Sequence, residues 1–415
     1  MKINARVKTY EVLKEIVIYR KYSNLVLRSS LDDVNDIDKK LITYIVYGSI
    51  QNYDYLLYQW SDLIKKKPSK EVEILLNMSI YQILFMDKLP EYAIVNEAVD
   101  IAKTIEYGKY YKMVNAILRE VLRRKERLLE GSELEILAIK TSHPLWLLKM
   151  WSKQYGLDIM NRIVKDNNKQ ANSAARANTM KCSINDILAN EKFTRGIIDN
   201  CVYYDGGNIA NTEEFKKGLL TIQDEASQLV AVFMQPKENE RILDTCGAPG
   251  TKTTHIAELM NDKGEIIALD IHQHRVELIK NSCKRLGIGS IDARCDDACS
   301  IDEQDYGLFD RILVDAPCSG YGVIRRKPDI KLHMNSNDMD EIIQLQKGIL
   351  NNTCKLLKSG GILVYSTCTL NKKENELQIK NFIEENKEFI LVEEKTIFPF
   401  ELDSDGFYMA KLLKV

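Results

Sequence analysis

Residues 241–257 read RILDTCGAPGTKTTHIA, and this stretch decides the fold. A short apolar run ends at Asp244, a turn with two glycines and a proline follows, and the next residues have a helical pattern. Such a turn lets backbone N–H groups approach a ligand at the start of a helix. The stretch therefore predicts one strand–turn–helix unit of an α/β domain.

The same alternation continues on the C-terminal side of this unit. Apolar runs end in EIIALDI, IDARCDDA, DRILVDAP and GGILVYSTC, and helical patterns separate most of them. Short apolar strands alternating with helices predict a parallel, doubly wound, Rossmann-like sheet. Ligands of such sheets bind outside the carboxyl ends of the strands. The turn at 244–252 matches neither GxGxxG nor GxxxxGK[ST], which disfavours a dinucleotide or a phosphate-loop site.

Acidic residues stand at the next two strand ends. Asp270 ends IIALD, where an acidic residue accepts hydrogen bonds from ribose hydroxyls. Asp297, or its neighbour Asp296, ends the following strand and could hold an adenine amino group. One solvated acid would be unremarkable, but turn, acid and acid in succession describe a nucleoside pocket. Without a phosphate loop, this pocket suits S-adenosylmethionine better than NAD.

Two cysteines also stand at strand ends, Cys318 in LVDAPCSGYG and Cys368 in YSTCTL. They could be packed thiols, a disulfide, a metal pair or chemical reagents. Nine cysteines form no CxxC, and the five histidines are scattered, so zinc spacing is absent. The others are expected to be small buried hydrophobes: Cys182, Cys201, Cys246, Cys283, Cys295, Cys299 and Cys354.

The chain divides by pattern into three modules. Residues 1–128 are predicted to form an all-α bundle, 129–218 a linker and a small α+β module, and 219–415 the Rossmann-like domain. The first 125 residues carry a charge of +5 and the remainder −7, which is weakly consistent with a polyanion partner of the N-terminal module. The sequence has neither a membrane-length apolar run nor a signal-peptide pattern, so we expect a cytoplasmic protein.

The motifs together resemble a known family. DAPCSGxG with STCTLxxxENE, behind the loop CGAPGTK, resembles the RNA 5-methylcytosine methyltransferases. VNEAV (95–99) and MVNAILRE (113–120) resemble the NusB family of helical RNA-binding domains. The combination narrows the resemblance to the RsmB branch, also called Sun or Fmu. By analogy with that branch, the middle module is expected to be RRM-like.

The resemblance implies a reaction and a set of residues. It implies methylation at C5 of a 16S ribosomal RNA cytosine, number 967, by a monomeric enzyme that uses S-adenosylmethionine. Cys368 is then the thiolate that adds to C6, Cys318 serves release, and Asp315 assists at N3 and helps to place the methyl donor. The implied cofactor-binding residues are Cys246, Gly247, Ala248, Pro249, Gly250, Thr251, Lys252, Asp270, Arg275, Asp297 and Asp315.

Two details bear on this site. An unperturbed thiol has a pKa near ~8.5, so a thiolate needs local help, and Lys252 is a candidate for it. The family loop usually reads PGGK, whereas this chain has Thr251 in place of the second glycine. Threonine can cap a helix N-terminus, so we expect a modest change in loop geometry and retained binding.

A basic stretch, VIRRKPDIK, follows the Cys318 turn. It is either a solvated loop or a contact to RNA phosphates, and in the second case Arg325 and Arg326 are the RNA-binding residues. The target base must leave its stack to meet Cys368, so single-stranded or loop RNA is the expected substrate.

Three alternatives remain open. A tRNA cytosine methyltransferase would share the motifs, although the tRNA enzymes lack the NusB-like module. A non-catalytic RNA-binding factor with a relic methyltransferase body is disfavoured, because Cys318 and Cys368 are both retained. An NAD-dependent oxidoreductase is disfavoured by the missing GxGxxG.

Overall fold

The computed structural model describes residues 4–335 and 339–415 and divides into two compact units. The helical unit runs to Asn168 and also contains the segment Lys327–Met334. The sheet unit contains Lys169–Arg326 and the rest of the chain to Val415. Within the described ranges, none of the helices combines the length and the apolar content that a membrane crossing requires.

The helical unit is all-α, as predicted. Its elements are α1 (Ala5–Val17), α2 (Ser23–Ser30), α3 (Asp36–Gln51), α4 (Tyr53–Ser61), α5 (Lys70–Phe85), α6 (Glu91–Ala102), η1 (Ile105–Gly108), α7 (Tyr111–Arg124), α8 (Glu133–Thr141), α9 (Leu145–Tyr155), α10 (Leu157–Asn167) and α17 (Ile330–His333). Side chains at the N-termini cap several of these helices. Asn35 accepts from two backbone N–H groups of α3, and Ser132 forms a reciprocal capping box with Glu135 at α8. Trp60 is fully buried in the core, where its indole N–H donates to Asn77 at 2.8 Å.

A four-stranded antiparallel sheet forms the small module of the sheet unit, in the order β2-β3-β1-β4. Its elements are β1 (Ala174–Ala177), α11 (Ile184–Leu188), β2 (Phe193–Arg195), β3 (Cys201–Tyr204), η2 (Ile209–Asn211), α12 (Glu213–Lys216) and β4 (Leu220–Ile222). The strand β4 lies beyond the predicted boundary at 218, because it pairs with β1. The helices α8 to α10, expected in this module, fall in the helical unit instead.

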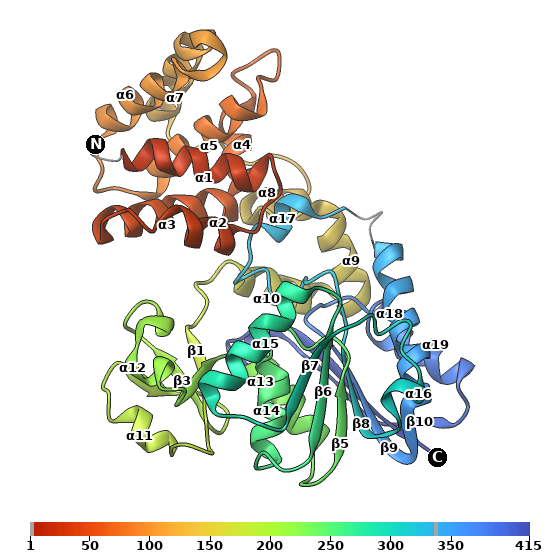
Figure 1. The fold of residues 1–415 in the computed structure, drawn as a ribbon. Helices are drawn as coiled ribbons and strands as arrows, with labels where there is room; N and C mark the ends of the chain where they lie inside the picture. The colour runs from red at the N-terminus through yellow and green to blue at the C-terminus, as the bar shows by residue number, and fades with distance from the viewer. Residues whose placement is uncertain (1–3, 336–338) are drawn as a thin grey trace. The chain divides into compact units, whose positions relative to one another are not determined.

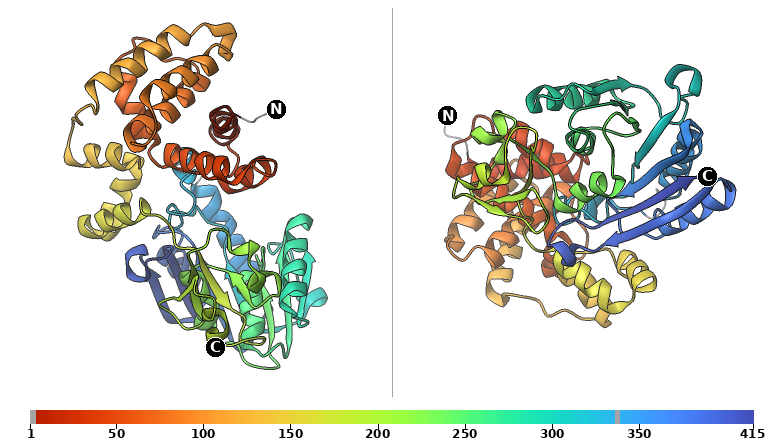
Figure 2. Two further views of the ribbon diagram at one scale, coloured as in Figure 1. Left: turned by 90° about the vertical axis from the view of Figure 1, so that its left-hand side faces the viewer. Right: turned by 90° about the horizontal axis from the view of Figure 1, so that it is seen from below.

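The remaining elements build a seven-stranded sheet in the order β10-β11-β9-β8-β5-β6-β7 (Figure 1). They are α13 (Glu225–Met234), β5 (Arg241–Asp244), α14 (Thr251–Leu259), β6 (Glu265–Asp270), α15 (Gln273–Leu286), β7 (Ile291–Cys295), α16 (Glu303–Tyr306), β8 (Phe309–Asp315), α18 (Met339–Thr353), η4 (Cys354–Leu356), β9 (Leu357–Thr367), α19 (Glu376–Glu385), β10 (Phe389–Ile397), α20 (Pro399–Leu402) and β11 (Phe407–Lys414). Strands β5 to β9 are parallel, and β11 is antiparallel to both β9 and β10. The antiparallel pair β10 and β11 is drawn in blue in the right-hand view of Figure 2.

Alternate residues of these strands pack on opposite faces of the sheet. On β8, Ile312 and Val314 join the core that contains α18 and α19, whereas Leu313 joins the core of α13, α14 and α15. Figure 1 shows these two groups of helices on the two sides of the sheet. Both faces are therefore covered, which is why the strands read as continuous apolar runs. The doubly wound prediction is confirmed.

The strand order places the motifs along one edge of the sheet. β8, β5, β6 and β7 are neighbours in this order and are parallel, so their carboxyl ends lie side by side. These ends carry Asp315, the glycine turn, Asp270 and Cys295 with the acids that follow it. The strand β9 is the parallel neighbour of β8 on the other side and brings Cys368 to the same edge.

Candidate active site

Two thiols meet at the carboxyl ends of β8 and β9. The register pairs Asp315 with Ser366, so the turns that follow the two strands start level with each other. Cys318 Sγ and Cys368 Sγ lie 3.3 Å apart and form a hydrogen bond. A disulfide bond is about 2.05 Å long. The two cysteines are therefore free thiols in contact. The other seven cysteines are also free.

The two thiols differ in their electrostatic surroundings. The hydrogen bond with Cys368, followed by burial and the negative charge of Glu374, holds the pKa of the Cys318 thiol well above its ordinary value. Lys252 interacts electrostatically with Cys368. The Cys368 sulfur thus lies in the field of a cation, whereas the charge of the Glu374 carboxylate acts on Cys318.

An ion pair lies beside the thiols. Lys252 Nζ contacts Asp315 Oδ2 at 2.7 Å, and the hydroxyl of Ser366 donates to Asp315 Oδ1 at 2.8 Å. Burial alone would lower the pKa of Lys252, but the attraction of Asp315 outweighs it and the net shift is upward. The ammonium also lies over the ring of Phe407, 5.0 Å from its centroid. Lys252 is therefore held as a cation at the point where the sequence suggested it.

The glycine turn between β5 and α14 is compact and tied to the next strand. Gly247 N donates to the carbonyl of Leu269 at 2.8 Å, and Gly250 N donates to the carbonyl of Gly247 at 2.7 Å. Gly250 has a φ of 98°, and a Cβ there would lie 3.2 Å from the backbone of Ile279, so only glycine is accommodated without strain. Thr251 is the first residue of α14, and its side chain does not cap the helix. The capping role considered for Thr251 is therefore wrong, because Gly250 occupies the N-cap position.

Asp270 lies at the next strand end and is 4% exposed. Its Oδ1 accepts from the backbone N–H of His272 at 3.1 Å, and its Oδ2 pairs with Arg275 at 3.1 Å. Arg275 also donates to the carbonyl of Ala248 in the glycine turn, at 3.3 Å. A carboxylate has about four acceptor sites, so Asp270 retains acceptor capacity for hydroxyl donors.

Two acids follow β7, and the structure distinguishes them. Asp296 Oδ2 accepts from the hydroxyl of Tyr306 at 2.6 Å, and its Oδ1 accepts from the backbone N–H of Asp297. Asp297 is exposed, and its Oδ1 accepts from the backbone N–H of Cys299 at 2.9 Å. Asp297 is thus the better candidate for a ligand contact, because both carboxylate oxygens of Asp296 have internal partners.

The charges around the turn match a cationic nucleoside. Burial, followed by the charges of Asp244, Asp315 and Asp270, raises the pKa of the Cys246 thiol to about 12, so all three carboxylates act at the turn. Burial also raises the pKa of Asp244 to about 7. A sulfonium cation with a ribose diol complements such an acidic site, whereas a pyrophosphate would be repelled. The residues present therefore fit S-adenosylmethionine.

Comparisons with known proteins agree with this geometry. Family models match three parts of the chain: the NusB family at residues 3–123, the ferredoxin-like domain of Methyltr_RsmF/B at 143–190, and 16S rRNA methyltransferase RsmB/F at 231–413. A probable ribosomal RNA small subunit methyltransferase B of Bacillus subtilis (strain 168) is 37% identical, over 100% of this chain and 99% of the relative. The chain belongs to the RsmB/F family of 16S rRNA methyltransferases. It is an S-adenosylmethionine-dependent RNA methyltransferase.

Solved structures support the same fold. The crystal structure of PH0851 aligns with a TM-score of 0.86 at 24% identity and covers all of both chains. A methyltransferase homologue from Pyrococcus horikoshii aligns with a TM-score of 0.61 at 26% identity, over 69% of this chain and 100% of the homologue. The NusB match thus covers α1 to α7 of the helical unit, the ferredoxin-like match runs from α9 and α10 of that unit to β1 and α11 of the small sheet, and the RsmB/F match covers the seven-stranded, Rossmann-like sheet.

The basic stretch after Cys318 has a structural role in this family member. Arg325 is 8% exposed, and its guanidinium donates to the carbonyl of Gln170 at 2.9 Å and pairs with Asp403 at 2.7 Å. Arg326 pairs with Asp405 at 2.9 Å and with Asp224. Internal carboxylates and carbonyls bind both guanidinium groups, so a contact of these two arginines with RNA phosphates stays a prediction and would compete with these partners.

The sequence reasoning missed the residues that connect the motifs. Arg176 on β1 is 1% exposed, donates to the carbonyl of Thr251 at 2.9 Å and pairs with Glu258 of α14 at 2.7 Å. Ser366, one residue after Tyr365 in the cysteine motif, orients Asp315. Glu374, quoted only as part of ENE, bonds to the Cys318 turn. A fully buried carboxylate or arginine leaves no mark in a single sequence, since charged residues are ordinarily exposed.

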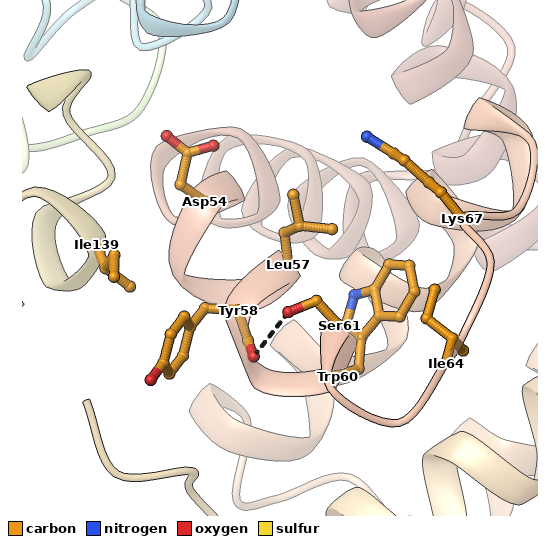
Figure 3. A pocket seen from close by; sticks show the side chains of 8 residues that line it. All are labelled: Asp54, Leu57, Tyr58, Trp60, Ser61, Ile64, Lys67 and Ile139. Atoms are coloured by element: carbon orange, nitrogen blue, oxygen red, sulfur yellow. Dashed lines mark hydrogen bonds between the residues drawn. The ribbon is translucent and has the colours of Figure 1, made fainter. Parts of the chain in front are cut away.

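A separate cavity of about 410 Å³ opens on the helical unit (Figure 3). Its lining comes from α4, the loop after it and α8: Asp54, Leu57, Tyr58, Trp60, Ser61, Ile64, Lys67 and Ile139. The cavity contains no cysteine and none of the predicted site residues. The cavity is therefore not the candidate methyltransferase site, whose residues stand at the strand ends of the sheet unit.

Proposed function

We propose that this protein methylates C5 of a cytosine in 16S ribosomal RNA, cytosine 967, and that it acts as a monomer in the cytoplasm. The observation that carries the proposal is the 3.3 Å contact between Cys318 and Cys368 beside the Lys252–Asp315 pair. Bound S-adenosylmethionine supplies the methyl group. The residues proposed to hold it are those of the turn from Cys246 to Lys252, with Asp270, Arg275, Asp297 and Asp315.

The attack step uses Cys368. Cytosine C5 is too electron-poor to take a methyl group directly, and a thiolate that adds to C6 makes C5 nucleophilic. Lys252 favours the thiolate on Cys368, as its electrostatic interaction with this residue indicates. Asp315, held by Ser366 and Lys252, is positioned to assist at N3 of the base.

The release step uses Cys318. After methylation a base takes the C5 proton, the bond between Cys368 Sγ and C6 breaks, and the electron pair returns to Cys368. We assign Cys318 to this step because it is the titratable group in contact with Cys368 Sγ. Its raised pKa keeps a proton on Cys318, which can pass to the departing Cys368 sulfur at 3.3 Å, and the Cys318 thiolate that results can take the C5 proton.

The ribosomal substrate is favoured over tRNA by two observations. The NusB family model matches residues 3–123, and the Bacillus subtilis relative, 99% of which is aligned with this chain, is named for small-subunit ribosomal RNA. A non-catalytic RNA-binding role is disfavoured, because the two thiols and the ion pair are assembled in reaction geometry. A relic site would not need to keep the two sulfur atoms within hydrogen-bonding distance.

Trapping on RNA tests the proposal. Cys318→Ala is expected to attack and methylate but not to release, so it accumulates a protein–RNA complex that survives denaturing electrophoresis and carries labelled methyl. Cys368→Ala is expected to bind RNA reversibly and to give no methylated product. The measurement uses 16S RNA transcripts, with mapping of the modified nucleotide and a tRNA pool as the competing substrate.

The controls separate the possible failures. Cys354→Ala removes a buried cysteine of η4 and should leave methylation unchanged. A stable complex with Cys368→Ala in place of Cys318→Ala would exchange the two roles. Full activity of both variants would reduce the thiols to packing residues, and label in the tRNA pool alone would overturn the ribosomal substrate.

A further inference from the structure

Glu374 is a fully buried carboxylate between the two cysteine-bearing turns. It is 0% exposed and lies six residues after Cys368, just before α19. No ion pair of Glu374 is found in residues 4–335 and 339–415, so neutral groups bind its charge. Burying an ionised carboxylate is costly unless hydrogen bonds compensate for the lost water. Its partners therefore indicate what the structure gains from it.

Four donors converge on the carboxylate from three segments of the chain. Ser319, next to Cys318, donates its backbone N–H to Oε2 at 2.9 Å and its hydroxyl to Oε1 at 2.6 Å. The side-chain amides of Asn371 and Gln346 donate at 2.9 and 3.2 Å. Each oxygen thus accepts two hydrogen bonds, and Glu374 bridges the Cys318 turn, the Cys368 loop and α18.

The same residues form further links between the two turns. Ser319 Oγ contacts Thr369 Oγ1 at 2.7 Å, and Thr369 Oγ1 accepts from the backbone N–H of Tyr321 at 3.2 Å. Gln346 also donates to the carbonyl of Pro317 at 2.9 Å. The residues on either side of Cys318 are therefore fixed against the loop that carries Cys368.

We propose that Glu374 is a positioning residue of the methyl transfer reaction: its carboxylate holds the Cys318 turn and the Cys368 loop in the register that brings the two sulfur atoms together. Glu374 touches no reacting atom in this role and acts through Ser319. Its negative charge also favours the protonated form of Cys318, one of the causes of the raised pKa of that thiol. The inference rests on the proposed roles of Cys318 and Cys368.

Glu374→Gln tests the inference, because glutamine keeps the volume but loses the charge and replaces an acceptor oxygen with a donor. We expect kcat to fall by about 10-fold to 100-fold, since hydrogen bonds to charged groups contribute about 1.5–3 kcal/mol. The KM for RNA and the affinity for S-adenosylmethionine should stay within about twofold. The variant should also accumulate a methyl-labelled protein–RNA complex, as Cys318→Ala does.

A pH profile separates positioning from general loss of structure. In a Cys368→Ala background, alkylation of Cys318 by iodoacetamide, resolved by mass spectrometry, should move to lower pH in Glu374→Gln. Glu374→Asp keeps the charge and should retain the wild-type profile with a smaller loss of kcat. Glu384→Gln, an exposed position of α19, is the matched control and should behave as wild type.

The outcomes distinguish the two proposals. If Cys318→Ala traps RNA but Glu374→Gln turns over at the wild-type rate with an unchanged alkylation profile, the positioning role is overturned. If Cys318→Ala itself traps nothing and stays active, the covalent mechanism has failed. Should Glu374→Gln not fold, Ser319→Ala removes one donor and leaves the carboxylate, and it should lower kcat without moving the alkylation profile; wild-type turnover of Ser319→Ala would then overturn the inference.

Discussion

At the scale of single residues, the two thiols of the candidate site have neighbours of opposite charge. Cys318 and Cys368 are in contact, yet Lys252 acts on one of them and Glu374 on the other. Two thiols of equal acidity would share a charge or oxidise readily. The opposite charges on the two sides support the proposed division of roles, in which Cys368 attacks and Cys318 keeps its proton. The chemistry thus depends on neighbours about as much as on the cysteines.

The prediction at the scale of single residues concerns Asp270 and the affinity for S-adenosylmethionine. Asp270→Ala should weaken S-adenosylmethionine binding by at least about tenfold, because a charge-assisted contact to the ribose hydroxyls contributes roughly 1.5–3 kcal/mol. Calorimetric titration measures the affinity. Asp292→Ala on β7, whose carboxylate is 52% exposed and pairs with Arg294, is the control and should bind as wild type. Unchanged affinity in folded Asp270→Ala would remove this residue from the site.

At the scale of elements, the segment Lys327–Met334 with α17 is the most unexpected feature. It lies between β8 and α18 in the chain but packs in the helical unit. Lys331 is 6% exposed, and its ammonium donates to the carbonyls of Gln51 at 2.7 Å and Thr141 at 3.1 Å, at the ends of α3 and α8. N–H donors at helix C-termini satisfy carbonyls that have no partner within the helix. The lysine considered for RNA contact is therefore a buried structural residue.

Lys331 also predicts a pH dependence of stability. Burial, partly offset by Asp54, lowers the pKa of Lys331 from 10.5 to about 7 in the folded protein. Between these values the unfolded chain binds more protons, so the stability of the helical unit should rise with pH, by up to about 1.4 kcal/mol per unit. The contribution is complete above the unfolded pKa and is lost as the pH falls through about 7.

Thermal unfolding at pH 7 and pH 9 measures this effect. Wild type should gain stability in the helical unit across the interval, and Lys331→Met, which has no titrating group, should not. Lys327→Met is the control in the same segment, because Lys327 is exposed. Equal pH responses of wild type and Lys331→Met would show that Lys331 stays charged in the folded state.

At the scale of the whole molecule, charge is divided between the parts of the chain. The first 125 residues carry +5 and the remainder −7, and the acidic part includes the carboxylates of the cofactor site. Phosphate contacts make RNA binding dependent on salt. The NusB-like part is thus the better candidate for recruiting RNA, and the sheet unit for binding a cationic methyl donor.

A paired charge experiment tests this division. Lys65 and Lys66 lie exposed in the loop between α4 and α5, and changing both to Gln should weaken RNA binding and flatten its salt dependence. Lys387→Gln with Lys395→Gln removes the same charge from exposed positions of the sheet unit and should change RNA affinity less. Equal losses in the two double variants would contradict a recruiting role of the N-terminal part.

Much of the fold and of the site could be predicted from sequence, because those signals are local. Each signal is contained in one short stretch of sequence: the strand–turn–helix of 241–257, the acid at Asp270 and the two cysteine motifs. Parallel strands place their carboxyl ends at one edge, so local motifs predicted a shared site. The all-α N-terminal part could be predicted for the same reason, from the helical spacing of its apolar residues and from capping residues such as Asn35.

Only the tertiary structure decided which charged side chains are used inside the protein. Arg325, Arg326 and Lys331 read as a basic surface stretch, yet carboxylates and helix-end carbonyls distant in sequence bind all three. Glu374 read as one polar residue of ENE, yet it is buried and bonded to Ser319, 55 positions away. Sequence by itself determined the fold, the family and the candidate reactive groups. The tertiary structure decided which partners set the charge and position of these side chains. Burial and long-range hydrogen bonds depend on which segments meet in space.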